Sequence, residues 1–137
     1  MDLGIEGNAA LITASTSGLG LAAARSLSQE GVDVVINGRN RDRLAAAADV
    51  LKEDAVGRVV SQPGDITVTE DVEALVERTI DEFGRLDHLV TSAGGPPSGP
   101  FLETTDGDWY DAYDLLVMSV VRLVRFAADY LETGGGT

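Results

Sequence analysis

The sequence predicts an α/β fold in which helices cover both faces of a doubly wound parallel sheet. Short apolar runs rich in β-branched residues alternate with segments that repeat apolar residues at helical spacing, and glycines or prolines separate the two kinds. Strands that alternate with helices form parallel sheets with right-handed crossovers. A chain of 137 residues is long enough to build one such domain around one core.

Four segments have the length and composition of buried strands, namely residues 8–13, 32–37, 58–62 and 86–91. Helices are predicted between them over 18–29, over 41–53, and from a capping Thr69 to Gly84.

A long final helix is predicted over 108–131, before a run of three glycines. It is apolar on two faces. One face can cover the sheet, with Trp109 as its anchor, and the other needs a later helix or another subunit.

The formal net charge of −13 argues against nucleic acid or an anionic membrane as a partner. Lys52 is the only lysine, against nine arginines, which resembles proteins of salt-loving organisms; a merely acidic protein is the alternative. The absence of cysteine excludes disulfides and thiolate sites, and no other residue cluster suggests a metal. No long apolar run or signal peptide is present, so we expect a cytoplasmic protein.

The turn after the first strand has the composition of a phosphate-binding loop. Glycines there let the backbone approach a pyrophosphate, and the following helix offers free N–H groups and the positive end of its dipole. The alternative is a tight strand–helix turn that binds nothing. The residues expected to bind the cofactor here are Thr13, Ser15, Thr16, Ser17, Gly18, Leu19 and Gly20.

The end of the second strand indicates which dinucleotide is bound. In such folds a residue about 20 positions after the glycine turn lies against the adenosine ribose, and a carboxylate there favours NAD. This chain has Asn37-Gly38-Arg39 instead, with no carboxylate before Asp42. Arg39 can pair with a 2′-phosphate, so NADP(H) is favoured over NAD(H).

These motifs resemble those of the short-chain dehydrogenase/reductase family, over the whole chain and in the family's order. The segment from Thr13 to Gly20 is similar to its Thr-Gly-x-x-x-Gly-x-Gly motif. Gly64-Asp65-Ile66 resembles its adenine site, where the Asp accepts from the adenine amino group and the backbone of the next residue contacts the ring. Ser92-Ala93-Gly94 resembles the tail of its Asn-Asn-Ala-Gly motif.

The resemblance, which is nearest to the branch of 3-oxoacyl carrier-protein reductases, implies a Rossmann-type sheet of about four strands in the order 3-2-1-4. It also implies self-association, as a dimer or tetramer, through the long helix over 108–131. Ala14 stands in place of the family's first glycine. Thr91 and Ser92 replace its two asparagines, and Leu116 replaces the asparagine that supports its proton-relay water.

The family's catalytic Ser and Tyr-x-x-x-Lys lie beyond the long helix, and no tyrosine here has a lysine four residues later. No catalytic residue is therefore predicted in this chain. We expect residues 1–137 to be a single dinucleotide-binding half-domain that ends before the family's fifth strand. The whole reductase would move a hydride between NADPH and a carbonyl or alcohol substrate. The alternative is a non-catalytic nucleotide-binding or oligomerisation module.

Overall fold

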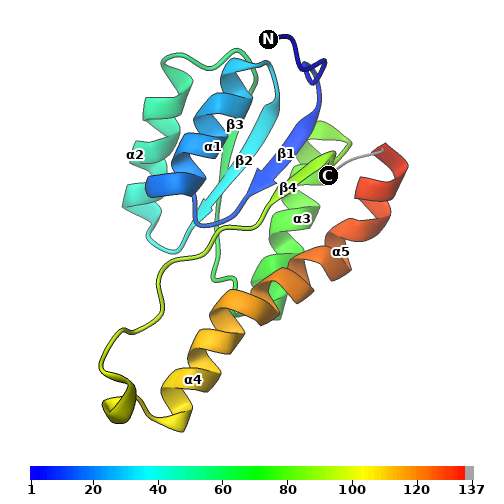
Figure 1. Ribbon diagram of the computed structural model, residues 1–137. Helices are drawn as coiled ribbons and strands as arrows, with labels where there is room; N and C mark the ends of the chain where they lie inside the picture. The colour runs from blue at the N-terminus through cyan, green and yellow to red at the C-terminus, as the bar shows by residue number, and fades with distance from the viewer. Residues whose placement is uncertain (135–137) are drawn as a thin grey trace.

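A computed structural model describes residues 1–134, and four parallel strands form its centre (Figure 1). The strands are β1 (Ala9–Ile12), β2 (Asp33–Gly38), β3 (Val59–Pro63) and β4 (His88–Val90). They lie in the order β3-β2-β1-β4, and Ile12 of β1 is in register with Ile36 of β2 and Val90 of β4. The predicted doubly wound sheet and its strand order are confirmed.

Helices follow each strand and cover both faces of the sheet. They are α1 (Gly18–Gln29), α2 (Arg41–Lys52), α3 (Thr69–Phe83), α4 (Asp106–Tyr113) and α5 (Ser119–Gly134). A single 3₁₀ turn, η1 (Phe101–Glu103), precedes α4, and a π-helical turn, η2 (Asp114–Met118), joins α4 to α5. Within the described residues, no helix is long and apolar enough to cross a membrane.

Strand side chains alternate between two separate cores, as the period of two in a strand requires. Ile12 of β1 and Ile36 of β2 point toward α1 and α2, where they meet residues such as Leu51. Leu11 and Val35, their neighbours along the chain, point the other way, into a core built with α3 and α5. All five of these side chains are fully buried, so the sheet is apolar on both faces.

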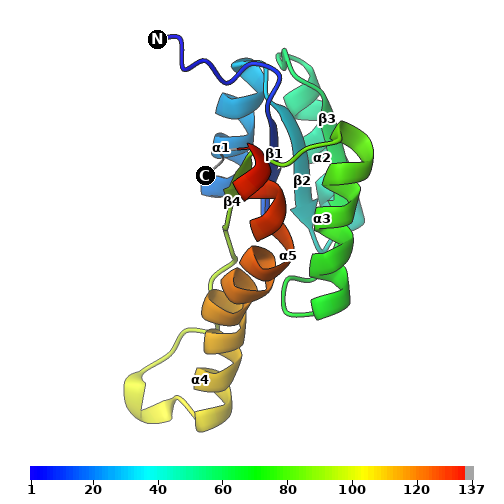
Figure 2. The ribbon, with the colours of Figure 1, turned by 90° about the vertical axis from the view of Figure 1, so that its right-hand side faces the viewer.

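The long helical segment differs from its prediction. It begins at Asp106 behind a capping box made by Thr105 and Asp108, and its α5 half packs on α3. The buried residues of α5 are Ser119, Leu123 and Ala127. Trp109 is not an anchor against the sheet, because it lies on α4, which extends beyond the sheet (Figures 1 and 2).

Two details at the helix ends also differ. Thr69 is the first residue of α3 rather than its cap, and Val68 stands at the cap position. The predicted end of the long helix falls partly on residues 135–137, which lie outside the described residues, and Gly134 is still helical.

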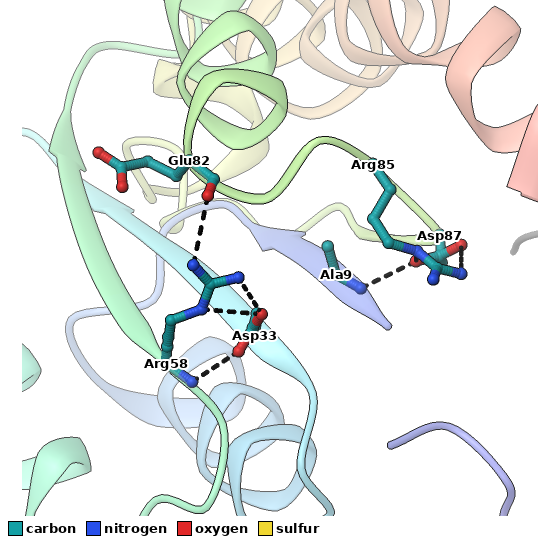
Figure 3. Close-up of polar contacts among 6 residues, drawn as sticks. All are labelled: Ala9, Asp33, Arg58, Glu82, Arg85 and Asp87. Carbon is teal, nitrogen blue, oxygen red and sulfur yellow. Dashed lines mark hydrogen bonds and ion pairs between the residues drawn. The ribbon is translucent and has the colours of Figure 1, made fainter. Parts of the chain in front are cut away.

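The amino ends of the strands are joined by two carboxylates and two guanidinium groups (Figure 3). Asp87, just before β4, accepts from the N–H of Ala9 at 2.8 Å and pairs with Arg85 at 2.6 Å. Asp33, the first residue of β2, accepts from the N–H of Arg58 at 2.8 Å and pairs with its guanidinium at 2.6 Å. These contacts tie β4 to β1 and β3 to β2 at the edge opposite the predicted site.

Candidate functional site

The carboxyl ends of all four strands lie at one edge of the sheet, because the strands are parallel. The four segments that the sequence singles out follow directly after these ends, so the fold brings them together. From this edge the chain after β4 runs outward to α4 (Figure 1). The geometry of each segment decides which of its groups are free to meet a ligand.

The first two hydroxyls of the turn after β1 are used inside the protein. Thr13 donates to the carbonyl oxygen of Ser92 at 2.7 Å and accepts from the N–H of Ser92 at 3.1 Å. The Ser15 hydroxyl donates to the carbonyl of Ile12 at 2.8 Å and accepts from the N–H of Asn37 at 2.9 Å. Both side chains are fully buried and both hydroxyls are engaged within the protein, so they shape the turn; contact of Thr13 and Ser15 with a cofactor stays a prediction.

The backbone of this turn is tightly constrained at three positions. Gly18 has φ +58° and Ala14 has φ +45°, and both lie in the left-handed region. Glycine adopts this region freely, whereas alanine is strained there by its Cβ. A Cβ at Gly20 would lie 2.5 Å from the carbonyl oxygen of Ala14, so α1 can only start this close to the turn with glycine there.

The start of α1 presents unused donors to solvent. Ser17 is its N-cap, but the Ser17 side chain makes no capping hydrogen bond. No acceptor for the N–H groups of Gly18, Leu19 and Gly20 lies within residues 1–134. Leu19 is 88% exposed at the tip of the turn. A helix start of this kind favours an anion through its N–H groups and its dipole.

Asn37, whose amide carries no signal in the sequence beyond its lack of charge, connects three of the four segments. Its side-chain Oδ1 accepts from the N–H of Ala14 at 3.2 Å. Its Nδ2 donates to the carbonyls of Gln62 at 3.2 Å and Gly64 at 3.1 Å. It is 2% exposed, and a buried amide that satisfies one N–H and two carbonyls has a fixed orientation.

The segment after β3 is held from several sides. Asp65 donates its N–H to the carboxylate of Asp71 at 2.8 Å, and its own Oδ1 accepts from the N–H and the hydroxyl of Thr67 at 2.9 and 2.7 Å. These hydrogen bonds from Thr67, helped by the positive charge of Arg39, hold the pKa of Asp65 below its usual value despite partial burial. The Ile66 side chain is buried in the core, so this residue offers its backbone to the site.

Arg39 is exposed at the carboxyl end of β2 and forms no ion pair within the described part of the chain. An open depression of about 360 Å³ lies beside the glycine turn, between α1 and α2. Thr16, Ser17 and Arg43 supply its polar lining. The turn thus borders on cationic side chains in a chain whose net charge is −13.

The segment after β4 completes the edge. Ser92 is fixed to Thr13 through its backbone, and Ala93 packs against the core of α3 and α5. Gly94 is exposed, and a Cβ there would meet nothing within 4 Å. The backbone beyond Ala93 is therefore open to a ligand lying over β1 and β4.

A family model described as "short chain dehydrogenase" matches residues 8–137. The chain belongs to the short-chain dehydrogenase family. This member resembles dehydrogenase/reductase SDR family member 4 of Caenorhabditis elegans, with 33% identity over 96% of this chain and 51% of the relative. It also resembles the (5R,7aS)-5-hydroxy-7a-methyl-1-oxo-2,3,5,6,7,7a-hexahydro-1H-indene-carboxyl-CoA reductase of Mycobacterium tuberculosis, with 37% identity over 93% of the chain and 49% of the relative.

Solved structures of family members have the same fold. L-sorbose reductase from Gluconobacter frateurii, determined with NADPH and L-sorbose, superposes with a TM-score of 0.92 and 40% identity, over 98% of this chain and 51% of that one. Hydroxysteroid dehydrogenase from Escherichia coli gives a TM-score of 0.88 and 30% identity, over 96% and 55%. The short-chain dehydrogenase chain described here thus corresponds to the N-terminal part of these proteins and spans about half their length.

Proposed function

We propose that this chain is the NADP(H)-binding portion of an oxidoreductase that acts on a carbonyl or alcohol substrate. The observation that carries the proposal is Arg39. It is exposed beside the glycine turn, interacts electrostatically with Asp65, and stands where an NAD-binding fold places a carboxylate. The NADPH held by the structural relative L-sorbose reductase supports the same choice of cofactor.

The residues at the carboxyl edge fit a dinucleotide in their chemistry. The N–H groups of Gly18, Leu19 and Gly20 would hold the pyrophosphate at the positive end of the α1 dipole, with the Thr16 and Ser17 hydroxyls beside them. Arg39 would pair with the 2′-phosphate. When bound, the cofactor supplies the hydride, and the protein supplies binding and orientation.

The adenine and nicotinamide ends would meet the other two segments. Oδ2 of Asp65 makes no hydrogen bond within residues 1–134 and would accept from the adenine amino group, with the Ile66 backbone against the ring. The backbone of Ser92, Ala93 and Gly94 would border the other half of the cofactor. Residues 1–137 contain no Tyr-x-x-x-Lys. We therefore infer that this chain binds the cofactor but does not by itself catalyse hydride transfer.

The decisive test is calorimetric titration of NADPH and NADH into the wild-type chain and Arg39→Asp. We expect the variant to lose NADPH affinity at least about tenfold and to keep its NADH affinity, because the new carboxylate repels only the 2′-phosphate. Arg125→Asp, an equally charge-reversing change at an exposed position of α5, is the control and leaves both affinities unchanged. Equal losses for both dinucleotides would contradict the assignment of Arg39.

A second proposal concerns self-association. The α4–α5 segment exposes Tyr113, Val117, Val121 and Val124, each by at least two-fifths, at a spacing that places them on one helical face. We propose that a second copy of the chain covers this face. Sedimentation velocity should show a dimer or tetramer, and Val121→Glu should shift it toward monomer; a monomeric wild-type chain would contradict the proposal.

A further inference from the structure

We infer that Asn37 is a positioning residue for the cofactor site, and that it acts by holding Ala14 in its strained conformation and by fixing the loop after β3. This inference rests on the proposed binding of NADP(H). Asn37 itself is 2% exposed and offers no surface to a ligand, so its effect must pass through its neighbours.

The first neighbour is Ala14. Its φ of +45° is the single left-handed φ of a non-glycine residue within residues 1–134. Such a conformation persists only where the surroundings enforce it. The Ala14 N–H donates to Asn37 Oδ1 at 3.2 Å, and the Ser15 N–H and the Asn37 carbonyl meet at 2.8 Å. Two successive N–H groups of the turn are thus bound to the same residue of β2.

The second neighbour is the loop that carries Asp65. Asn37 Nδ2 donates to the carbonyl of Gly64 at 3.1 Å, directly before Asp65. The backbone of Asn37 also leads, through Gly38, to Arg39. A Cβ at Gly38 would lie 2.4 Å from Cγ2 of Thr16, so the turn packs directly on this part of β2. Asn37 therefore sets the positions of the glycine turn and the adenine loop relative to Arg39.

The chemical requirement at this position is specific. The amide must accept from one N–H and donate to two carbonyls, and asparagine does both in one planar group. Aspartate keeps the acceptor for Ala14 but places an oxygen against the carbonyls of Gln62 and Gly64. Alanine loses all three contacts. Since binding improves when the site is already in its bound geometry, either loss should weaken the cofactor complex.

The test compares NADPH dissociation constants by calorimetry, well below the melting temperature, in the wild-type chain, Asn37→Ala and Asn37→Asp. We expect the dissociation constant to rise about tenfold for Asn37→Ala and by a smaller factor for Asn37→Asp. The control is Asn40→Ala, which removes the amide that caps α2 through the N–H of Arg43. It should lower the melting temperature and leave the dissociation constant unchanged, which separates stability from positioning.

Ala14→Gly supplies the rescue. Glycine adopts a positive φ without help, so Asn37→Ala should cost only about threefold in affinity when Ala14 is replaced as well. The Ala14→Gly background also allows the effect of Asn37→Ala to be measured if Asn37→Ala does not fold in the wild-type chain. Unchanged NADPH affinity in folded Asn37 variants, or an equal loss in both backgrounds, would overturn the inference. A wild-type chain that binds no NADPH would instead overturn the proposed function.

Discussion

The two edges of the sheet are held by different chemistry. At the amino edge, the carboxylates of Asp33 and Asp87 bind backbone N–H groups and pair with Arg58 and Arg85. At the carboxyl edge, the amide of Asn37 and the buried hydroxyls of Thr13 and Ser15 join the loops through hydrogen bonds between uncharged groups.

The difference separates stability from binding. Burial alone would raise the pKa of Asp87, but hydrogen bonds from Arg85 and Ala9 outweigh it and hold the pKa below its usual 3.8. The two carboxylates and two guanidinium groups at the amino edge thus pair with one another. Arg39 lies beside the neutral network at the carboxyl edge and forms no ion pair within residues 1–134, so its guanidinium can pair with an anionic ligand.

The largest expected effect is on the amino edge. Asp87→Ala removes the carboxylate that pairs with Arg85 and leaves the buried N–H of Ala9 without an acceptor, so the free energy of unfolding should fall by about 3 kcal/mol. Urea unfolding followed by circular dichroism measures the change. Asp81→Ala, at an exposed site of α3, is the control and should change little. A loss below about 0.5 kcal/mol for Asp87→Ala would mean that the amino edge does not depend on its charges.

A pH series sharpens the same point with Asp87→Asn, which keeps the shape and loses the charge. At pH 7 the free energy of unfolding of Asp87→Asn should be lower than that of the wild type by about 1.5 kcal/mol. Because the folded pKa of Asp87 is depressed, the charged pair stabilises the wild type above the unfolded pKa and is lost as the pH falls through the folded value. The difference in free energy of unfolding between the variant and the wild type should therefore be constant from about pH 7 to 5 and become smaller below about pH 4. If this difference in free energy of unfolding is unchanged at pH 3, the loss of stability in Asp87→Asn comes from packing and not from the lost charge.

The smallest effect lies at the carboxyl edge. Ala14→Gly relieves the left-handed strain but makes the unfolded chain more flexible, so a net stabilisation of about 0.5–1 kcal/mol is expected in thermal or urea unfolding. Ala22→Gly, at an exposed position within α1, is the matched control and should destabilise by about 1 kcal/mol. Destabilisation by both changes would show that the turn carries no strain.

Local patterns were sufficient for the fold and for the outline of the site. The alternation of strands and helices gave the sheet, and the order of its strands followed from the resemblance to a known family. The glycine turn, Arg39 and the Asp65 loop all follow strand ends, so their meeting at one edge was a consequence of parallel pairing. Their contacts with a cofactor stay predictions.

Two features depended on contacts that a linear pattern does not contain. Asn37 and Gly64 are far apart in the chain, and the sequence gives no sign that the amide of one would meet the carbonyl of the other. On the long helix, Trp109 was predicted to anchor the helix on the sheet but is exposed, because almost every face is apolar and the pattern did not single out the one that meets α3.

One continuous helical segment passes from a packed core into solvent, since α5 buries three residues and α4 buries none. Local opening free energy is set by the contacts that must be broken, and it therefore declines along this segment toward Asp106. Amide protons of α4 can exchange with water through fraying of a few turns, whereas those around Leu123 require the sheet to open as well. The π-helical turn between them marks the boundary between two units of different cooperativity within one helix.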